Sequence, residues 1–204
     1  EPELIDAQVC IEFSQPAAAL ANLRRIAKLG KPLVVGTTGW YQDLPSARKV
    51  VQEKKTACVY APNFSLGLNL YLKVVERTAQ LFGSFEDYDV LTMETHHSQK
   101  IDSPSGTANR IGETLLEHFP RKKRIVTESL DRPIAPDELH LLAARAGHFP
   151  GTHWVIFDSP ADSVELVHRA RSRQGFARGA VLAAEWIQGQ QGFYSFSQML
   201  QEIL

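Results

Sequence analysis

Short apolar runs alternate with helical patterns in the first third of the chain, and this alternation limits the fold more than any other feature. Residues 7–13, 33–35 and 57–61 are apolar enough for buried strands, whereas residues 16–29 and 43–55 have the spacing of helices. A strand–helix–strand–helix–strand order predicts a parallel sheet with right-handed crossovers. We therefore expect an α/β fold in which a parallel sheet forms the first unit.

The rest of the chain predicts a second unit of α+β type. A long helix at residues 66–82 leads out of the first unit, and its stripe of Leu66, Leu70, Val74 and Leu81 is expected to be buried. Residues 139–146 fit either a helix or a strand. Strand patterns are clearer over residues 88–94, 152–157 and 164–171. A helix over residues 176–188 and an amphipathic tail over residues 193–204 are expected to pack back on the first unit.

Composition excludes several classes of partner. The 204 residues carry a formal charge of −1, with acidic and basic residues mixed along the chain, which argues against nucleic acid or a membrane surface as a partner. No stretch approaches the roughly 18 apolar residues of a membrane span. Cys10 and Cys58 lie in apolar runs, as buried free thiols of a reducing compartment would, so we expect a cytoplasmic protein.

Residues 94–107 hold the densest chemistry in the sequence. Two adjacent histidines, His96 and His97, and Lys100 follow a strand pattern, and a Ser-Gly-Thr turn at residues 105–107 opens a helical pattern. Lysine is a point charge, and histidine titrates near neutral pH. The free N–H groups of a helix that starts near Gly106 would hold a carboxylate. The stretch therefore predicts a binding site for an anionic ligand.

The pattern Glu-x-His-His-x-x-Lys-x-Asp-x-Pro-Ser-Gly-Thr-Ala in this stretch resembles the signature of the dihydrodipicolinate reductase (4-hydroxy-tetrahydrodipicolinate reductase) family. The resemblance implies reduction of a cyclic dicarboxylate by NADH or NADPH in lysine and diaminopimelate biosynthesis, and a homotetramer formed through the second sheet. It also favours a strand over residues 139–146, which gives a mixed second sheet of about four strands. Gln99 stands where the family usually has histidine.

By this resemblance, His96 and Lys100 are the predicted catalytic residues. His96 is the expected general acid/base and Lys100 a second proton donor. His97, Lys100, Gly106 and Thr107 are the predicted substrate-binding residues, since a dicarboxylate needs positive charge and N–H donors.

The predicted cofactor contacts lie at the carboxyl ends of two strands of the first sheet, where ligands of open α/β sheets bind. The tetrapeptide Gly36–Gly39 alone could be only a tight turn. The resemblance assigns Gly36, Thr37 and Thr38 to a nicotinamide cofactor, together with Ala61, Asn63 and Phe64. The nicotinamide is then expected in a cleft between these residues and the His96–Lys100 loop.

The Gly-x-Gly-x-x-Gly turn of dinucleotide-binding proteins does not occur in the sequence, and the match corresponds to about the last three-quarters of a family member. We therefore expect an incomplete Rossmann-like domain in residues 1–62, completed by residues 180–204, whose missing first part lies upstream. Residues 63–179 are the expected substrate-binding and oligomerisation domain. A short variant that cannot hold the cofactor pyrophosphate is the alternative.

Three other functions are possible for the histidine-rich stretch. Adjacent residues of an extended chain point to opposite sides, so His96 and His97 cannot easily share a metal ion, and we expect no metal. Ser105 lacks the nucleophile-elbow sequence of a serine hydrolase. A non-catalytic relative that binds the dicarboxylate and has lost the cofactor site is the third. Elsewhere, we expect packing or surface roles for His148, His153 and His168, and a solvated basic turn at residues 121–124.

Overall fold

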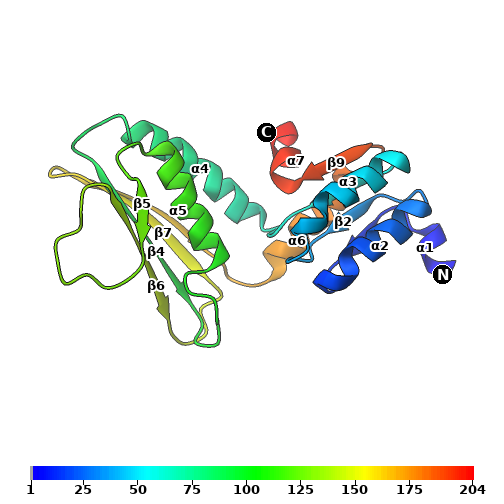
Figure 1. Ribbon diagram of the computed structural model, residues 1–204, viewed down its shortest axis with the longest axis horizontal. Helices are drawn as coiled ribbons and strands as arrows, with labels where there is room; N and C mark the ends of the chain where they lie inside the picture. The colour runs from blue at the N-terminus through cyan, green and yellow to red at the C-terminus, as the bar shows by residue number, and fades with distance from the viewer. Residues whose placement is uncertain (1) are drawn as a thin grey trace. The chain divides into compact units, whose positions relative to one another are not determined.

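The computed structural model describes residues 2–204, which form two compact units (Figure 1). One unit contains the chain up to Leu66 together with Gln174–Leu204, and the other contains Gly67–Arg173. The chain therefore leaves the first unit after Leu66 and returns to it at Gln174. The boundaries that we predicted from the sequence were at residues 62 and 180. Within residues 2–204, no helix is both long and apolar enough to cross a membrane.

The first unit is built on a parallel sheet, as predicted, with four strands instead of the three expected. Its strands run in the order β1-β2-β3-β9, with bounds Cys10–Glu12, Leu33–Val35, Ala57–Tyr60 and Gly192–Ser195. Strand β9 lies at the start of the tail for which we predicted only an amphipathic element. A four-residue strand that begins with a glycine has too short a pattern to be recognised.

Helices cover both faces of this parallel sheet. Packed on one face are α2 (Pro16–Lys28) and α3 (Leu44–Glu53), through a core that includes Leu23 and Val51. On the other lie α6 (Gln174–Trp186) and α7 (Phe196–Ile203). Two short helices, α1 (Pro2–Asp6) and η1 (Tyr41–Asp43), complete the unit. This arrangement, with helices on both faces of a parallel sheet, confirms the predicted Rossmann-like class. It also explains the apolar runs in the sequence, because strands buried on both faces need apolar side chains throughout.

The second unit contains a mixed sheet of five strands, one more than predicted. The order is β5-β6-β4-β7-β8, with bounds Arg124–Val126, Glu138–Arg145, Asp89–His96, Thr152–Asp158 and Ser163–Arg169. The first three strands are parallel, and β7 and β8 add antiparallel pairs. The additional strand, β5, is three residues long and begins at the last residue of the basic run. A strand this short has no recognisable alternation of apolar and polar residues. That run is not simply a solvated turn: Lys122 is buried, and its Nζ lies 2.6 Å from an Asp89 carboxylate oxygen.

Helices α4 (Leu66–Phe82) and α5 (Gly106–His118) lie on one face of this sheet (Figure 1). Both contribute to its core, α5 through Ile111 and Leu115. The predicted stripe of α4 is wrong, because Val74 and Leu81 are exposed. Its buried face instead carries residues one or two positions away from the expected stripe, which are Leu68, Tyr71, Leu72, Val75 and Ala79. A helix apolar on several sides leaves the choice of face to tertiary packing.

Candidate active site

Strand β4 ends at His96, the first histidine of the pair, whose side chain is buried in the second unit. Alternate side chains of the strand are buried, so Glu94 and His96 face inward together while His97 lies half-buried beyond the strand end. The two adjacent histidines do not share one environment. The N–H of His97 donates to the carbonyl of Phe149, at 2.9 Å, which ties the loop to the segment before β7.

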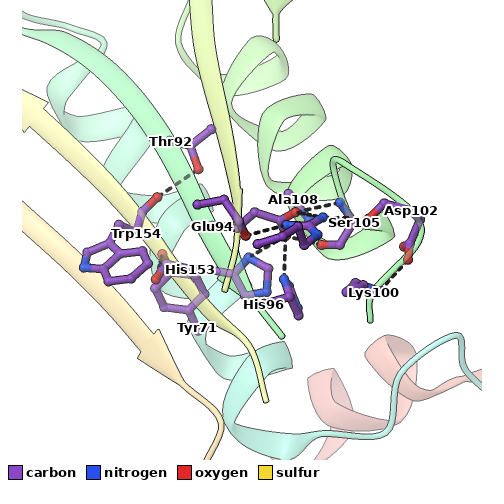
Figure 2. Close-up of polar contacts among 12 residues, drawn as sticks. Tyr71, Thr92, Glu94, His96, Lys100, Asp102, Ser105, Ala108, His153 and Trp154 are labelled. Atoms are coloured by element: carbon purple, nitrogen blue, oxygen red, sulfur yellow. Dashed lines mark hydrogen bonds and ion pairs between the residues drawn. The ribbon is translucent and has the colours of Figure 1, made fainter. Parts of the chain in front are cut away.

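Glu94 is fully buried and is the centre of the polar network in Figure 2. Its carboxylate accepts hydrogen bonds from the N–H of Ser105 (2.9 Å), from the Ser105 hydroxyl, and from Arg145 Nη2 (2.8 Å). Burial alone would raise the pKa of Glu94, but these hydrogen bonds outweigh it and hold that pKa below its usual value. The residue is therefore a buried, charged carboxylate.

Two histidine rings face this carboxylate. Nδ1 of His96 lies 3.2 Å from Glu94 Oε2, and Nδ1 of His153 lies 3.7 Å from the same oxygen, with the rings edge to face at 5.3 Å. Burial lowers the pKa of His96, and the nearby charge of Glu94 offsets part of that effect. The pKa of His153 falls to about 4, also because of burial. Burial thus disfavours the protonated form of both rings, and that of His153 more strongly.

The start of α5 is fixed by the same carboxylate. Ser105 is the N-cap, and its Oγ accepts a hydrogen bond from the N–H of Ala108 at 3.2 Å. Gly106 is exposed, with open space where a side chain would be. Glu94 thereby holds the N-terminus of α5 in place, and a helix N-terminus is a place where anions bind.

A carboxylate of the protein itself already lies at this helix start. Lys100 Nζ is 2.6 Å from Asp102 Oδ1 (Figure 2). Lys100 lowers the pKa of Asp102 most, and the backbone N–H of Gly106 lowers it further. Because Asp102 is more than half exposed, a ligand could replace it.

The structure brings His96, Lys100, Gly106 and Thr107 into one continuous element, the end of β4 and the loop that leads into α5. Sequence reasoning missed the residues that organise this element: Glu94, Ser105, Arg145 and His153. The period of two along β4 could have paired Glu94 with His96. Arg145 and His153 come from neighbouring strands β6 and β7, and no local pattern indicates such partners.

Glu94, His96 and His153 offer three buried ligand atoms within 4.8 Å of one another, which is the spacing of a metal site. Two features favour a histidine–carboxylate network instead. The Arg145 guanidinium would place positive charge beside any bound cation. The Ser105 hydroxyl and N–H already use lone pairs of both carboxylate oxygens.

Comparison with known proteins decides the family. Residues 2–64 match the family model described as dihydrodipicolinate reductase, N-terminus, and residues 67–200 match the corresponding C-terminus model. The chain belongs to the dihydrodipicolinate reductase family. The 4-hydroxy-tetrahydrodipicolinate reductase of Christiangramia forsetii is 40% identical over 195 residues, covering 96% of this chain and 80% of that protein. The enzyme of that name from Methanosarcina acetivorans is 38% identical, with 95% and 73% covered.

A solved structure shows the same fold. The dipicolinate-bound dihydrodipicolinate reductase from Paenisporosarcina sp. TG-14 superposes with a TM-score of 0.78 at 23% identity, covering 96% of this chain and 76% of that one. Dihydrodipicolinate reductases are nicotinamide-dependent oxidoreductases of lysine and diaminopimelate biosynthesis, and this member is one of them.

The predicted cofactor residues lie at one edge of the parallel sheet, because β2 ends at Val35 and its parallel neighbour β3 ends at Tyr60. Thr38 is exposed, and Gly36 and Asn63 are half-buried. A side chain at Gly36 would collide with the ring of Phe13, so the turn requires glycine.

The other three predicted cofactor residues are buried in the same unit. Thr37 Oγ1 accepts a hydrogen bond from the N–H of Ser14 at 2.8 Å. The Phe64 ring packs against Phe196, with centroids 4.9 Å apart, and Ala61 belongs to the same apolar core. These side chains hold the two turns in shape, so any contact that they make with a cofactor is through the backbone.

Proposed function

We propose that the protein reduces 4-hydroxy-tetrahydrodipicolinate to tetrahydrodipicolinate with NADH or NADPH. Membership of the family and the names of two relatives support this substrate. Dipicolinate, the ligand named for the solved family member, is a planar ring with two carboxylates, the same class of molecule. The overall reaction removes one water from the substrate and adds a hydride and a proton to neighbouring atoms.

The position of Asp102 is the observation that carries this proposal. Its carboxylate lies against Lys100 and near the N–H of Gly106, so the loop binds a carboxylate with the groups predicted for substrate. A substrate carboxylate in the same place would gain a charge-assisted bond from Lys100 and N–H donors at the start of α5. Thr107, half-buried in the first turn of α5, and His97 are the further proposed contacts.

His96 is the proposed proton donor. Its ring is 8% exposed at the end of β4, and Nδ1 faces Glu94, which leaves Nε2 for the substrate. A lowered pKa makes the imidazolium a stronger acid, which suits transfer of a proton to carbon. Lys100 cancels carboxylate charge and is the second proposed donor.

The nicotinamide cofactor supplies the hydride when bound. The residues proposed to contact it are Gly36, Thr37 and Thr38 after β2, and Ala61, Asn63 and Phe64 after β3. Chain reversals at the carboxyl ends of adjacent parallel strands are where such cofactors bind. The protein's own contribution is to orient the reacting groups and to neutralise the substrate's charge.

A homotetramer is the proposed assembly, with contacts through the open face of the second sheet. Four register partners cross that sheet as one apolar row, namely Leu142, Met93, Trp154 and Val167. Leu142 and Val167 are 39% and 42% exposed. Light scattering of the purified protein checks this assembly, and a monomer would contradict it.

The cytosol is the proposed compartment. Cys10 and Cys58 are both buried free thiols, and burial raises the pKa of each, so neither is a reactive thiolate. Stable free thiols are usual where the surroundings are reducing.

The experiment is a steady-state assay of the complete gene product with freshly generated substrate, run separately with NADH and NADPH. We expect substrate-dependent oxidation of at least one cofactor, a product mass lower by one oxygen atom, and competitive inhibition by dipicolinate. A protein that binds dipicolinate and oxidises neither cofactor would be a non-catalytic binder, and the proposal would be wrong.

A further inference from the structure

We propose that Glu94 is a positioning residue that couples the proton donor His96 to the carboxylate-binding start of α5. The inference rests on the proposed function and adds to it a single buried group that serves both halves of the site. Glu94 has no direct access to a ligand, since its side chain is fully buried. Any effect on the reaction must therefore pass through its neighbours.

One set of contacts leads from Glu94 to the start of the helix. Oε1 accepts the N–H of Ser105, and Oε2 accepts its hydroxyl proton. The same hydroxyl oxygen caps the helix by accepting the N–H of Ala108. Gly106 and Thr107 follow directly, so the direction of their N–H groups depends on how Ser105 is held.

A second contact leads from Glu94 to the proton donor. Nδ1 of His96 is buried and lies 3.2 Å from Oε2, within ion-pair distance, and it has no hydrogen-bond partner among the described residues. On the opposite side of the ring, a side chain at Gly151 would lie 2.8 Å from Nε2. The ring thus lies between a carboxylate at Nδ1 and Gly151 at Nε2, where any residue with a side chain would crowd Nε2.

The charges around His96 make the carboxylate necessary for its protonation. Lys100 and Arg145 disfavour the imidazolium, whereas Glu94 and, to a smaller extent, Asp102 favour it. The remaining titratable neighbour is the neutral ring of His153. Arg145, bonded to Glu94, keeps that carboxylate ionised. Without the charge of Glu94, two cations would face the ring and the pKa of His96 would fall.

Glu138 offers a matched control in the same sheet. It is also buried, and it accepts hydrogen bonds from Arg132 (2.8 Å), Arg124 (3.0 Å) and the N–H of Ala135 (2.9 Å). Among residues 2–204, the hydrogen bonds and ion pairs of Glu138 reach neither a histidine ring nor the α5 cap. Glu138→Gln therefore removes a buried charge beside arginine and leaves the His96 network intact.

The test compares Glu94→Gln with Glu138→Gln in the complete protein. A general acid must be protonated, so activity is lost as pH rises through its pKa. We expect Glu94→Gln to move the alkaline limb of the kcat profile to lower pH, to lower kcat about 10- to 100-fold at neutral pH, and to raise KM. Glu138→Gln should lower Tm and leave the limb in place. Histidine NMR titration gives the pKa of His96 without any assay.

The outcomes separate this inference from the proposed function. If wild-type protein is inactive, the proposed function fails, and the NMR titration still decides whether Glu94 controls His96. The inference would be overturned if Glu94→Gln had the same alkaline limb of the kcat profile and the same His96 pKa as Glu138→Gln. If Glu94→Gln does not fold, Glu94→Asp keeps the charge on a shorter side chain. We then expect KM to rise with little movement of the limb, and wild-type KM would contradict the coupling.

Discussion

Two buried carboxylates in one sheet, Glu94 on β4 and Glu138 on β6, differ in what they hold together. Both are almost completely buried, and both accept hydrogen bonds from arginine and from a backbone N–H. Arginines flank Glu138 on the outside of the unit, and its pKa is lowered to about 2, chiefly by Arg132. Glu94 instead contacts two histidines and the cap of α5.

The difference shows that a buried, charged carboxylate is not by itself the mark of a functional site. Ion pairs that only hold loops also perturb pKa values. What distinguishes Glu94 is that two of its partners lead to groups placed to reach a ligand: Ser105 to the helix N-terminus, and His96 to its own Nε2. The comparison thus predicts effects on catalysis around Glu94 and effects on stability around Glu138.

The largest expected effect is on the proton donor. His96→Gln removes the acid and keeps a polar side chain of similar length, so kcat should fall by about 10²–10⁴-fold with little change in KM. The measurement is steady-state cofactor oxidation, with thermal unfolding as the control for folding. A variant with near wild-type kcat would put the chemistry outside this loop.

Lys100→Met should impair both kinetic constants. The variant keeps the length of the side chain and removes the charge that now binds Asp102 and, in our proposal, a substrate carboxylate. We expect kcat to fall and KM to rise together, because the lost contact serves binding and proton transfer. A change in KM alone would restrict Lys100 to binding.

The sequence predicted more of the fold than of the site. The strand–helix order predicted the parallel sheet, which the structure confirms, whereas the roles that the signature assigns to His96, Lys100 and the start of α5 stay predictions. Residues brought to the site by contacts between strands were not predicted. We expected His153 to have only a packing or surface role, but it lies beside Glu94 because β7 pairs with β4. Strand β5 and the buried face of α4 were missed or misplaced because short patterns and broadly apolar helices do not fix packing.

Acid should destabilise the second unit through His153. Its pKa is about 4 when folded and about 6.5 when unfolded, so the unfolded state binds more protons between these values. The free energy of unfolding therefore falls as pH drops from about 6.5 to about 4, by about 3 kcal/mol in total. Denaturant unfolding at several pH values should show a shallower dependence for His153→Gln, while the exposed control His148→Gln keeps the wild-type slope.

The smallest expected effect is at the helix start. Thr107→Val keeps the shape of the side chain and removes one hydroxyl from the first turn of α5. We expect KM to rise by a few-fold, about 1 kcal/mol or less, with kcat nearly constant. If KM is unchanged and Tm falls, Thr107 serves only the helix.

The most direct test of the His96–Lys100 site is the double-mutant cycle of His96→Gln and Lys100→Met. If both act on one proton-transfer step in one loop, the double variant loses less activity than the product of the two single losses. Steady-state oxidation of NADH or NADPH by the four proteins gives the coupling. Strictly multiplicative losses would show two independent contributions, and wild-type kcat in both single variants would contradict the assignment of catalysis to this loop.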